Sequence, residues 1–437
     1  MNLEGIKVAY SSLGCKVNLY ESISIINKFL DNKATLVDFN EIADIYIINT
    51  CSVTNISDQK SKKMVRRAIK QNPNGVIAVM GCSSQLQFEE YQKIDGISVL
   101  IGTKDRDKLY DKIIDALSEK NQYFKHYDYL DFNTYEELKV NRYTDHTRGF
   151  IKIQDGCNNF CSYCTIPYAR GLIKSRDKDN VITEIKQMIN SGIKEIVLSG
   201  INTGAYGKDF NNYNLSNLLD DICNEICGDY QFRISSIEAT EITNELLDVI
   251  KKHKKHFCDH FHIPLQSGCD KTLKNMNRKY DTNYFRNKIA LIRSYFPDVN
   301  ITTDVLTGFN GETIEDYQTT YNFIKEIGFG ELHVFPYSKR PMTVAYSDKN
   351  TISSAIKKFR VNELISLNNE LAINYRNKFL GKKLDVIIEE IKNRKAYGHS
   401  SNYIEIEIDN PNLKENSKVE VILSKIDYPV SRGDVNV

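Results

Sequence analysis

The sequence predicts an α/β protein with three parts: a helix-covered parallel sheet, a parallel (β/α) barrel and a small all-β barrel. Short β-branched runs alternate with helical patterns in the first part, and a second alternating series of six strands with helices follows. The last part alternates apolar and polar residues without helical spacing. A length of 437 residues is enough for roughly three domains.

The composition is that of a folded globular protein with no overall preference for an anionic or cationic partner. Hydrophobic residues make up 41% and charged residues 26% of the chain. Lys and Arg number 58 against 57 Asp and Glu, so any RNA contact must come from local patches. No signal-like or bilayer-length apolar run occurs, so we expect a cytoplasmic protein without a membrane segment. In a reducing compartment, clustered cysteines indicate metal binding or catalysis rather than disulfides.

The N-terminal part, residues 1–121, is expected to form the parallel sheet. Its strand candidates are short, β-branched and separated by helical patterns, which is typical of a sheet with helices on its faces. From about 122 to 146 the sequence becomes polar and rich in tyrosine, which indicates a connecting segment. The expected strands lie at 7–10, 35–37, 45–48, 76–80 and 97–101.

Residues 147–372 are expected to form the barrel, whose ligands would lie beyond the carboxyl ends of its strands. Val181, Ile185 and Met188 share one face of a helix between two of these strands. A long helix is expected over about 352–379, and residues 373–437 are expected to form the small β-barrel domain. The expected strands lie at 150–154, 195–198, 232–237, 260–265, 300–306 and 331–337, and then at 384–389, 403–408 and 419–423.

Three cysteines lie within eight residues just after the first strand of the barrel. Cys157, Cys161 and Cys164 can be wrapped around one metal centre by a single loop. Three thiolates can hold three irons of a four-iron cluster and leave the fourth iron open to a ligand. No nearby histidine or fourth cysteine completes a zinc shell, so iron and sulfur are favoured, with structural zinc as the alternative.

Three further cysteines follow separate strands of the N-terminal sheet. Cys15, Cys51 and Cys82 each stand in a turn-like context at the carboxyl end of a predicted strand, where open α/β sheets bind their ligands. They are expected to converge on a second cluster, and buried packing of small side chains is the alternative. The remaining four cysteines are expected only to pack: Cys223, Cys227, Cys258 and Cys269.

With these motifs the chain resembles the radical-SAM methylthiotransferases over nearly its full length. Cys157-x3-Cys161-x2-Cys164, with Tyr163 before the last cysteine, resembles the radical-SAM signature. The flanking segments 154–157 and 165–171 narrow the resemblance to this family, whose N-terminal cluster ligands match Cys15, Cys51 and Cys82. The stretch 14–22, Gly-Cys-Lys-Val-Asn-Leu-Tyr-Glu-Ser, is similar to the branch that acts on threonylcarbamoyladenosine in tRNA.

The resemblance implies a flavodoxin-like N-terminal sheet, a partial (β/α)6 barrel of the TIM type and a C-terminal TRAM barrel, which is OB-like and binds RNA. It implies that the enzyme adds a methylthio group to C2 of N6-threonylcarbamoyladenosine at position 37, beside the anticodon. Within the family, the alternatives are N6-isopentenyladenosine in tRNA and an aspartate of a ribosomal protein. A non-catalytic iron–sulfur or zinc protein that binds RNA is the alternative from another class.

The implied cofactors are two 4Fe-4S clusters and S-adenosylmethionine. Cleavage of S-adenosylmethionine at the Cys157, Cys161 and Cys164 cluster would give a 5′-deoxyadenosyl radical, which can attack an unactivated C–H bond. The second cluster would hold the sulfur. The implied partners are the tRNA anticodon arm and an electron donor such as flavodoxin or ferredoxin. The expected S-adenosylmethionine contacts lie in the signature and at strand ends: Tyr163, Gly200, Asn202, Glu238 and Gln266.

Two patches are candidates for RNA contact. Lys62, Arg66 and Lys70 share one face of a predicted helix at i, i+4 spacing, which suits phosphates, although a solvated helix face is the alternative. In the terminal barrel, Tyr397 and Tyr403 are expected to stack on bases, next to basic residues at 392–395.

Overall fold

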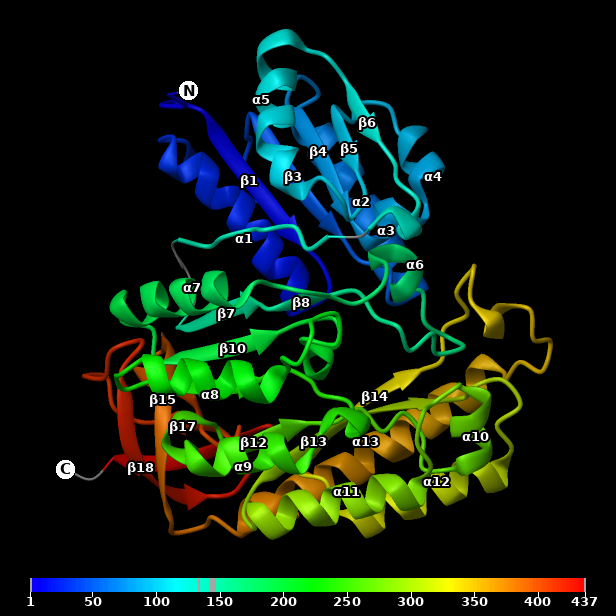
Figure 1. The fold of residues 1–437 in the computed structure, drawn as a ribbon, viewed down its shortest axis with the longest axis vertical. Coiled ribbons are helices and arrows are strands. Elements are labelled where there is room, and N and C mark those ends of the chain that lie inside the picture. The colour runs from blue at the N-terminus through cyan, green and yellow to red at the C-terminus, as the bar shows by residue number, and fades with distance from the viewer. Residues whose placement is uncertain (1, 133, 142–146, 436–437) are drawn as a thin grey trace.

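The computed structural model describes residues 2–132, 134–141 and 147–435, in three packed parts. Figure 1 shows the N-terminal sheet in blue and cyan above the green and yellow barrel, with the orange and red C-terminal strands beside it. Within the described residues, no helix is both long and apolar enough to cross a bilayer.

The N-terminal sheet is parallel and has the order β2-β1-β3-β4-β5-β6. Its first five strands follow the flavodoxin-like order, as predicted. Every residue of β3 and β4 is buried, which explains their nearly continuous apolar sequence. The strands are β1 (Lys7–Ser12), β2 (Thr35–Leu36), β3 (Ile45–Thr50), β4 (Val76–Gly81), β5 (Val99–Ile101) and β6 (Tyr123–Lys125).

Helices cover both faces of this sheet. Phe29 of α1 and Ile113 of α5 belong to one apolar core, whereas Val65 of α2 and Tyr91 of α4 belong to the core on the other face. The helices are α1 (Lys16–Asp31), α2 (Asn55–Gln71), α3 (Cys82–Leu86), α4 (Phe88–Gln92) and α5 (Leu109–Glu119). Strand β6 falls within the segment expected to be a connection, where it pairs with β5 and extends the sheet.

The barrel consists of two parallel three-stranded sheets, β7-β10-β11 and β12-β13-β14. Two backbone hydrogen bonds join them, from Cys258 N to Phe232 O at 2.9 Å and from Ile237 N to His262 O at 3.0 Å. The result is the predicted six-stranded partial barrel. Its strands are β7 (Arg148–Lys152), β10 (Glu195–Ser199), β11 (Gln231–Ile234), β12 (His260–His262), β13 (Asn300–Thr307) and β14 (Glu331–Pro336).

Seven helices accompany these strands within the described residues, and all but the first of them contribute to the large core of the barrel. A short antiparallel pair, β8 (Gln154–Asp155) and β9 (Lys174–Ser175), flanks the loop that carries three cysteines. The helices are α6 (Ile166–Arg170), α7 (Lys178–Asn190), α8 (Leu215–Glu225), α9 (Asn244–Lys252), α10 (Asp270–Asn275), α11 (Thr282–Tyr295) and α12 (Ile314–Ile327).

The C-terminal strands form a closed barrel in the order β15-β16-β17-β19-β18, which agrees with the predicted small β-barrel. The preceding helix α13 (Ser354–Asn377) lies within the range expected for it and spans the boundary expected at 372. Two of the strands, β16 and β19, were not predicted. The strands are β15 (Lys383–Lys392), β16 (Lys395–Ser400), β17 (Glu405–Ile408), β18 (Lys418–Lys425) and β19 (Val430–Val435).

Candidate metal centres and substrate cavity

A tight loop between β8 and α6 carries Cys157, Cys161 and Cys164. Gly156 turns the chain into this loop with a φ of 73°, and a Cβ there would lie 1.9 Å from the Leu172 carbonyl oxygen. Cys157 N donates a hydrogen bond to Gly171 O at 3.0 Å, and Cys164 N donates one to Cys161 O at 2.9 Å. These bonds close the loop, so the three thiols lie on one short, fixed segment.

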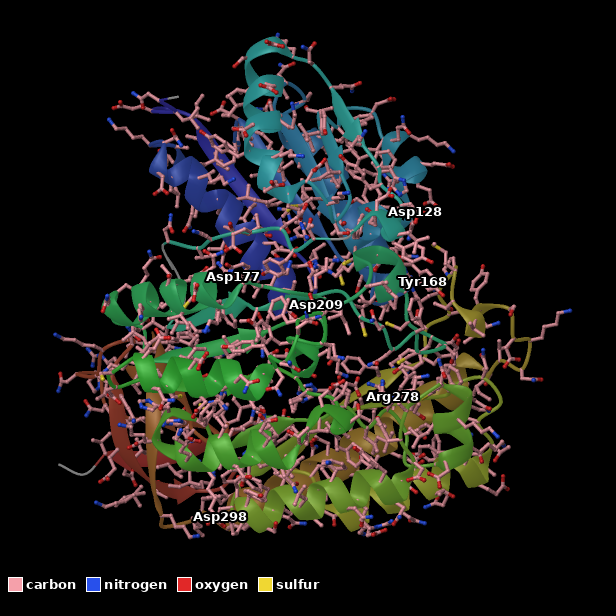
Figure 2. All side chains as sticks on the ribbon, viewed as in Figure 1. Asp128, Tyr168, Asp177, Asp209, Arg278 and Asp298 are labelled. Carbon is pink, nitrogen blue, oxygen red and sulfur yellow. The ribbon has the colours of Figure 1, made fainter. Side chains whose placement is uncertain are left out.

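The charges around this loop centre on Arg278. Its Nη1 donates to the Sγ of Cys161 at 3.3 Å, and its Nη2 binds the Glu238 carboxylate. Burial raises the pKa of Cys157 to about 11 and raises that of Cys164 as well. Figure 2 shows Tyr168 on α6 on one side of this region and Arg278 on the other. The buried thiols thus need a cation to become thiolates.

Cys15, Cys51 and Cys82 lie at the carboxyl edge of the N-terminal sheet, after β1, β3 and β4. A Cβ on Gly14 would lie 2.6 Å from the Sγ of Cys51, so the turn that precedes Cys15 packs directly on Cys51. Burial raises the pKa of Cys82 to about 12, and negative charge on Cys15 and Cys51 acts in the same direction. The structure therefore brings these three thiols together from three separate strands.

Both sets of cysteines fit a cluster better than a single zinc ion. A zinc ion with Zn–S bonds of about 2.3 Å holds its thiolates about 4 Å apart. Among the described residues, no cysteine belongs to a group of three or more side chains whose ligand atoms all lie within 4.8 Å of one another. Three spaced thiols without a fourth ligand suit a four-iron cluster, since each thiolate then binds a different iron.

Buried Arg170, at the end of α6, connects the two sets. Its Nε donates to the Sγ of Cys82 at 3.2 Å, and its Nη1 donates to Glu21 at 2.8 Å and to Asp155 at 3.0 Å. Lys152 Nζ lies 2.8 Å from Glu21 and 2.5 Å from Asp155. Arg106 also pairs with both carboxylates. The network joins the sheet domain to the barrel, and nothing in the sequence periodicity predicted it.

The residues expected to contact S-adenosylmethionine have different surroundings. Glu238 is held by Arg278 beside Cys161. The backbone N of Asn202 donates to Gln154 at 2.8 Å, while its buried Oδ1 has no hydrogen-bond partner among the described residues. The Tyr163 ring packs edge-on against Phe309.

The other two expected contacts are backbone positions. A Cβ on Gly200 would lie 2.9 Å from the Gln154 Oε1 atom. Gln266 has a φ of 68° and bridges to β13, where its N donates to Asp304 O at 2.8 Å. Gly200 thus lies next to the Asn202 backbone, whose N also contacts the Gln154 Oε1 atom. Gln266 lies on the other half of the barrel.

A cavity of about 450 Å³ lies inside the barrel, a size typical of small-ligand sites. Cys15 and Gly200 line it, and Tyr403 reaches it from the C-terminal barrel. His262 and His333 both contact Asp304 there, at 3.3 and 3.4 Å. The cavity therefore combines a cysteine of the sheet domain, polar side chains of the barrel and an aromatic ring of the terminal domain.

The residues expected to contact RNA have different surroundings. Lys62 pairs with Glu90 and donates to Gln87 at 2.6 Å, whereas Arg66 and Lys70 are exposed. The half-buried Tyr397 donates to Glu407 at 2.9 Å.

Tyr403, between β16 and β17, lies where the C-terminal barrel meets the (β/α) barrel. It stacks between His260 and His399, with ring centroids 4.8 and 4.9 Å away, because the C-terminal barrel packs against β12. Tyr403 therefore faces the cavity.

The other four cysteines lie away from both sets. Cys258 and Cys269 are buried, and their thiols donate to Glu195 at 3.6 Å and to Asp316 at 3.5 Å. Cys223 packs against the barrel core, as expected. Cys227 is exposed, so the expectation that it packs was wrong.

Family models match two regions of the chain. Residues 151–324 match the Radical SAM superfamily, and residues 7–102 match a family described as uncharacterized protein family UPF0004. Among solved structures, the radical S-adenosylmethionine methyltransferase TsrM from Kitasatospora setae is similar, with a TM-score of 0.58. At 12% identity over 78% of this chain and 77% of that one, this likeness concerns the fold alone.

Curated relatives match almost the whole chain. The threonylcarbamoyladenosine tRNA methylthiotransferase MtaB of Bacillus subtilis is 41% identical over 98% of this chain and 95% of its own length. The protein of that name from Aquifex aeolicus is 34% identical over 92% and 96%. A tRNA-2-methylthio-N(6)-dimethylallyladenosine synthase from Thermoanaerobacter pseudethanolicus is 33% identical over 87% and 82%. The chain therefore belongs to the radical-SAM methylthiotransferase family.

Proposed function

We propose that this chain is a tRNA-modifying enzyme that adds a methylthio group to C2 of N6-threonylcarbamoyladenosine at position 37. The observation that carries the proposal is the 41% identity, over 98% of the chain, to a threonylcarbamoyladenosine tRNA methylthiotransferase. Two relatives named for dimethylallyladenosine are 33% and 31% identical. The alternative substrates are isopentenyladenosine in tRNA and an aspartate of a ribosomal protein.

In this proposal Cys157, Cys161 and Cys164 hold one 4Fe-4S cluster, and Cys15, Cys51 and Cys82 hold the other. When bound, the two clusters and S-adenosylmethionine supply radical chemistry at one centre and sulfur at the other. The single loop of the first set supports this assignment, as does the convergence of the second set from three strands.

The surrounding residues favour thiolates and orient the cofactor. Arg278 donates to the Sγ of Cys161, which stabilises the thiolate that a metal needs. The Glu238 carboxylate, held by the same guanidinium, would accept hydrogen bonds from the amino group of S-adenosylmethionine. The unpartnered Oδ1 of Asn202 is a second acceptor for that group.

The cavity inside the barrel would hold the nucleobase. His260 and Tyr403 both line it and form a stacked pair, which suits a flat ring. The rest of the anticodon arm would contact the outer surface, where Arg66 and Lys70 offer positive charge. An electron donor such as flavodoxin or ferredoxin would reduce the first cluster. Both partners are cytoplasmic, which is where the proposal places the enzyme.

The test is anaerobic reconstitution of the full chain with iron and sulfide, followed by incubation with a reductant, S-adenosylmethionine and tRNA from a strain that lacks the gene. Mass spectrometry of the digested nucleosides should detect the 2-methylthio product of threonylcarbamoyladenosine alone. A methylthio product on isopentenyladenosine, or on ribosomal protein, would move the chain to another branch. A preparation with one cluster and no reductant-dependent 5′-deoxyadenosine would identify a binding protein instead.

A further inference from the structure

The cavity inside the barrel is lined by several basic side chains, and most of them already have an acidic or polar partner. Arg233 binds Glu195 through two hydrogen bonds of 2.7 and 2.8 Å. His262 and His333 share the Asp304 carboxylate. These side chains thus have partners within the protein.

Lys16 also lines this cavity and differs from those groups. It is the first residue of α1 and follows Cys15 directly. Within the described part of the chain, its ammonium forms no hydrogen bond and no ion pair, although the residue is half-buried. Leaving a half-buried ammonium without an acceptor costs free energy, which a bound anion would recover.

Lys16 lines the cavity together with residues on the strands of the barrel. Burial lowers the pKa of His260 well below its ordinary value, and the charges of Arg233 and Lys16 act in the same direction. His260 lies on β12, across the cavity from the sheet domain. Its buried Nδ1 has no hydrogen-bond partner among the described residues. The cavity thus offers an unpaired cation and a second unpaired polar atom.

The candidate substrates differ in the group that this cavity would meet. The threonylcarbamoyl substituent carries a carboxylate, a hydroxyl and a urea-like linkage, whereas the isopentenyl substituent is purely apolar. A carboxylate can accept a charge-assisted hydrogen bond from an ammonium, and an apolar chain would leave that ammonium desolvated and unpaired. Loss of such a polar partner is a strong source of discrimination between substrates.

We propose that Lys16 binds the carboxylate of the threonylcarbamoyl group and so selects the substrate of this enzyme. The inference rests on the proposed function for the identity of the nucleoside. It identifies the residue that recognises the substituent on the adenosine. That residue directly follows Cys15, one of the cysteines assigned to the second cluster. The same ammonium would thereby orient the adenine with respect to the sulfur-bearing centre.

The test compares anticodon stem–loop RNAs that differ only in the substituent on adenosine 37. They carry the threonylcarbamoyl group, its methyl ester or the isopentenyl group. The reconstituted wild-type enzyme should bind the free carboxylate about tenfold or more tightly than the ester. Lys16→Met should remove this preference, and Lys16→Arg should retain most of it. Lys358→Met, an exposed lysine of α13, should behave as wild type.

The possible outcomes separate the two proposals. Equal affinity of the wild type for the acid and the ester would overturn the role of Lys16, and so would an unchanged preference in Lys16→Met. Failure of the wild type to modify threonylcarbamoyladenosine in the nucleoside assay would overturn the proposed function itself. If Lys16→Met loses iron because it adjoins Cys15, the acid and ester comparison in the wild type and in Lys16→Arg still decides the question.

Discussion

The Nε of Arg170 lies 3.2 Å from the Sγ of Cys82, so a residue of the barrel contacts a thiol of the N-terminal sheet. Arg170 ends the helix α6, which begins two residues after Cys164. A helix of five residues is about 7.5 Å long. One short rigid element therefore relates the two sets of cysteines, and the salt-bridge network around Arg170 holds it in place.

Removal of Arg170 should destabilise the protein strongly. Arg170→Met leaves Glu21 and Asp155 buried with less positive charge, and breaking a buried ion pair from one side costs about 3 to 5 kcal/mol. Denaturant unfolding of the anaerobic protein measures this loss. Arg286→Met, which removes an exposed pair with Glu326, should cost less than about 1 kcal/mol. Similar losses in the two variants would mean that the network contributes little.

A side chain at Gly156 should disrupt the first cysteine loop. In Gly156→Ala the new Cβ would meet the Leu172 carbonyl oxygen at 1.9 Å, at a φ of 73°. Because the obstacle is backbone, the loop must move, and we expect iron content to fall by about half, since only one of two clusters is affected. Gly192→Ala is the matched control: its φ is 93°, and nothing lies within 4 Å of the new Cβ. Full iron content in Gly156→Ala would contradict the expectation.

The two sets of cysteines should have separable roles. Cys161→Ala should abolish reductant-dependent cleavage of S-adenosylmethionine, whereas Cys15→Ala should retain cleavage and lose methylthio transfer. Chromatography of 5′-deoxyadenosine and nucleoside mass spectrometry measure the two steps. Cys258→Ser, which changes a buried thiol bonded to Glu195, should retain both clusters. Identical defects in Cys15→Ala and Cys161→Ala would reject the division.

The sequence predicted those features whose residues are contiguous or periodic. Cys157, Cys161 and Cys164 are a contiguous motif, and the buried strands β3 and β4 are apolar runs. Strand β16 was missed because Lys-Ala-Tyr-Gly-His-Ser contains no β-branched residue. Strand β19 was missed because Val-Ser-Arg-Gly-Asp-Val is mostly polar.

The remaining features depend on contacts between distant segments. Arg170 and Glu21 are 149 residues apart, and their pairing follows from how the sheet domain packs on the barrel. Tyr403 reaches the cavity because of how the C-terminal barrel docks against His260. Neither contact leaves a mark in local propensity or spacing, so a single sequence contains no signal for them.

The Asp304 and His333 pair should make stability depend on pH. The hydrogen bond that His333 donates to Asp304 raises the pKa of His333 above its ordinary value of about 6.5. The folded protein then binds this proton more tightly than the unfolded chain does. The stabilisation is complete below pH 6.5 and is lost as the pH rises through the higher folded pKa.

The free energy of unfolding of the wild type should therefore fall as the pH rises above 6.5, and in His333→Gln this fall should be smaller. Histidine hydrogen–deuterium exchange, followed by mass spectrometry, gives the pKa of His333 directly. A value at or below 6.5 would remove the basis of this prediction.

The salt dependence of tRNA binding should come from only two of the three basic residues of α2 that were expected to contact RNA. Arg66 and Lys70 are exposed, so each can neutralise a phosphate and release counterions, whereas Lys62 is already paired with Glu90. Arg66→Gln and Lys70→Gln should each lower the slope of log affinity against log salt by about 1. Lys62→Gln should change the slope less, because the Lys62 ammonium of the wild type is paired with Glu90 and releases few counterions when tRNA binds. Filter binding over a series of salt concentrations measures the three slopes, and a slope unaffected by all three changes would place the tRNA on another surface.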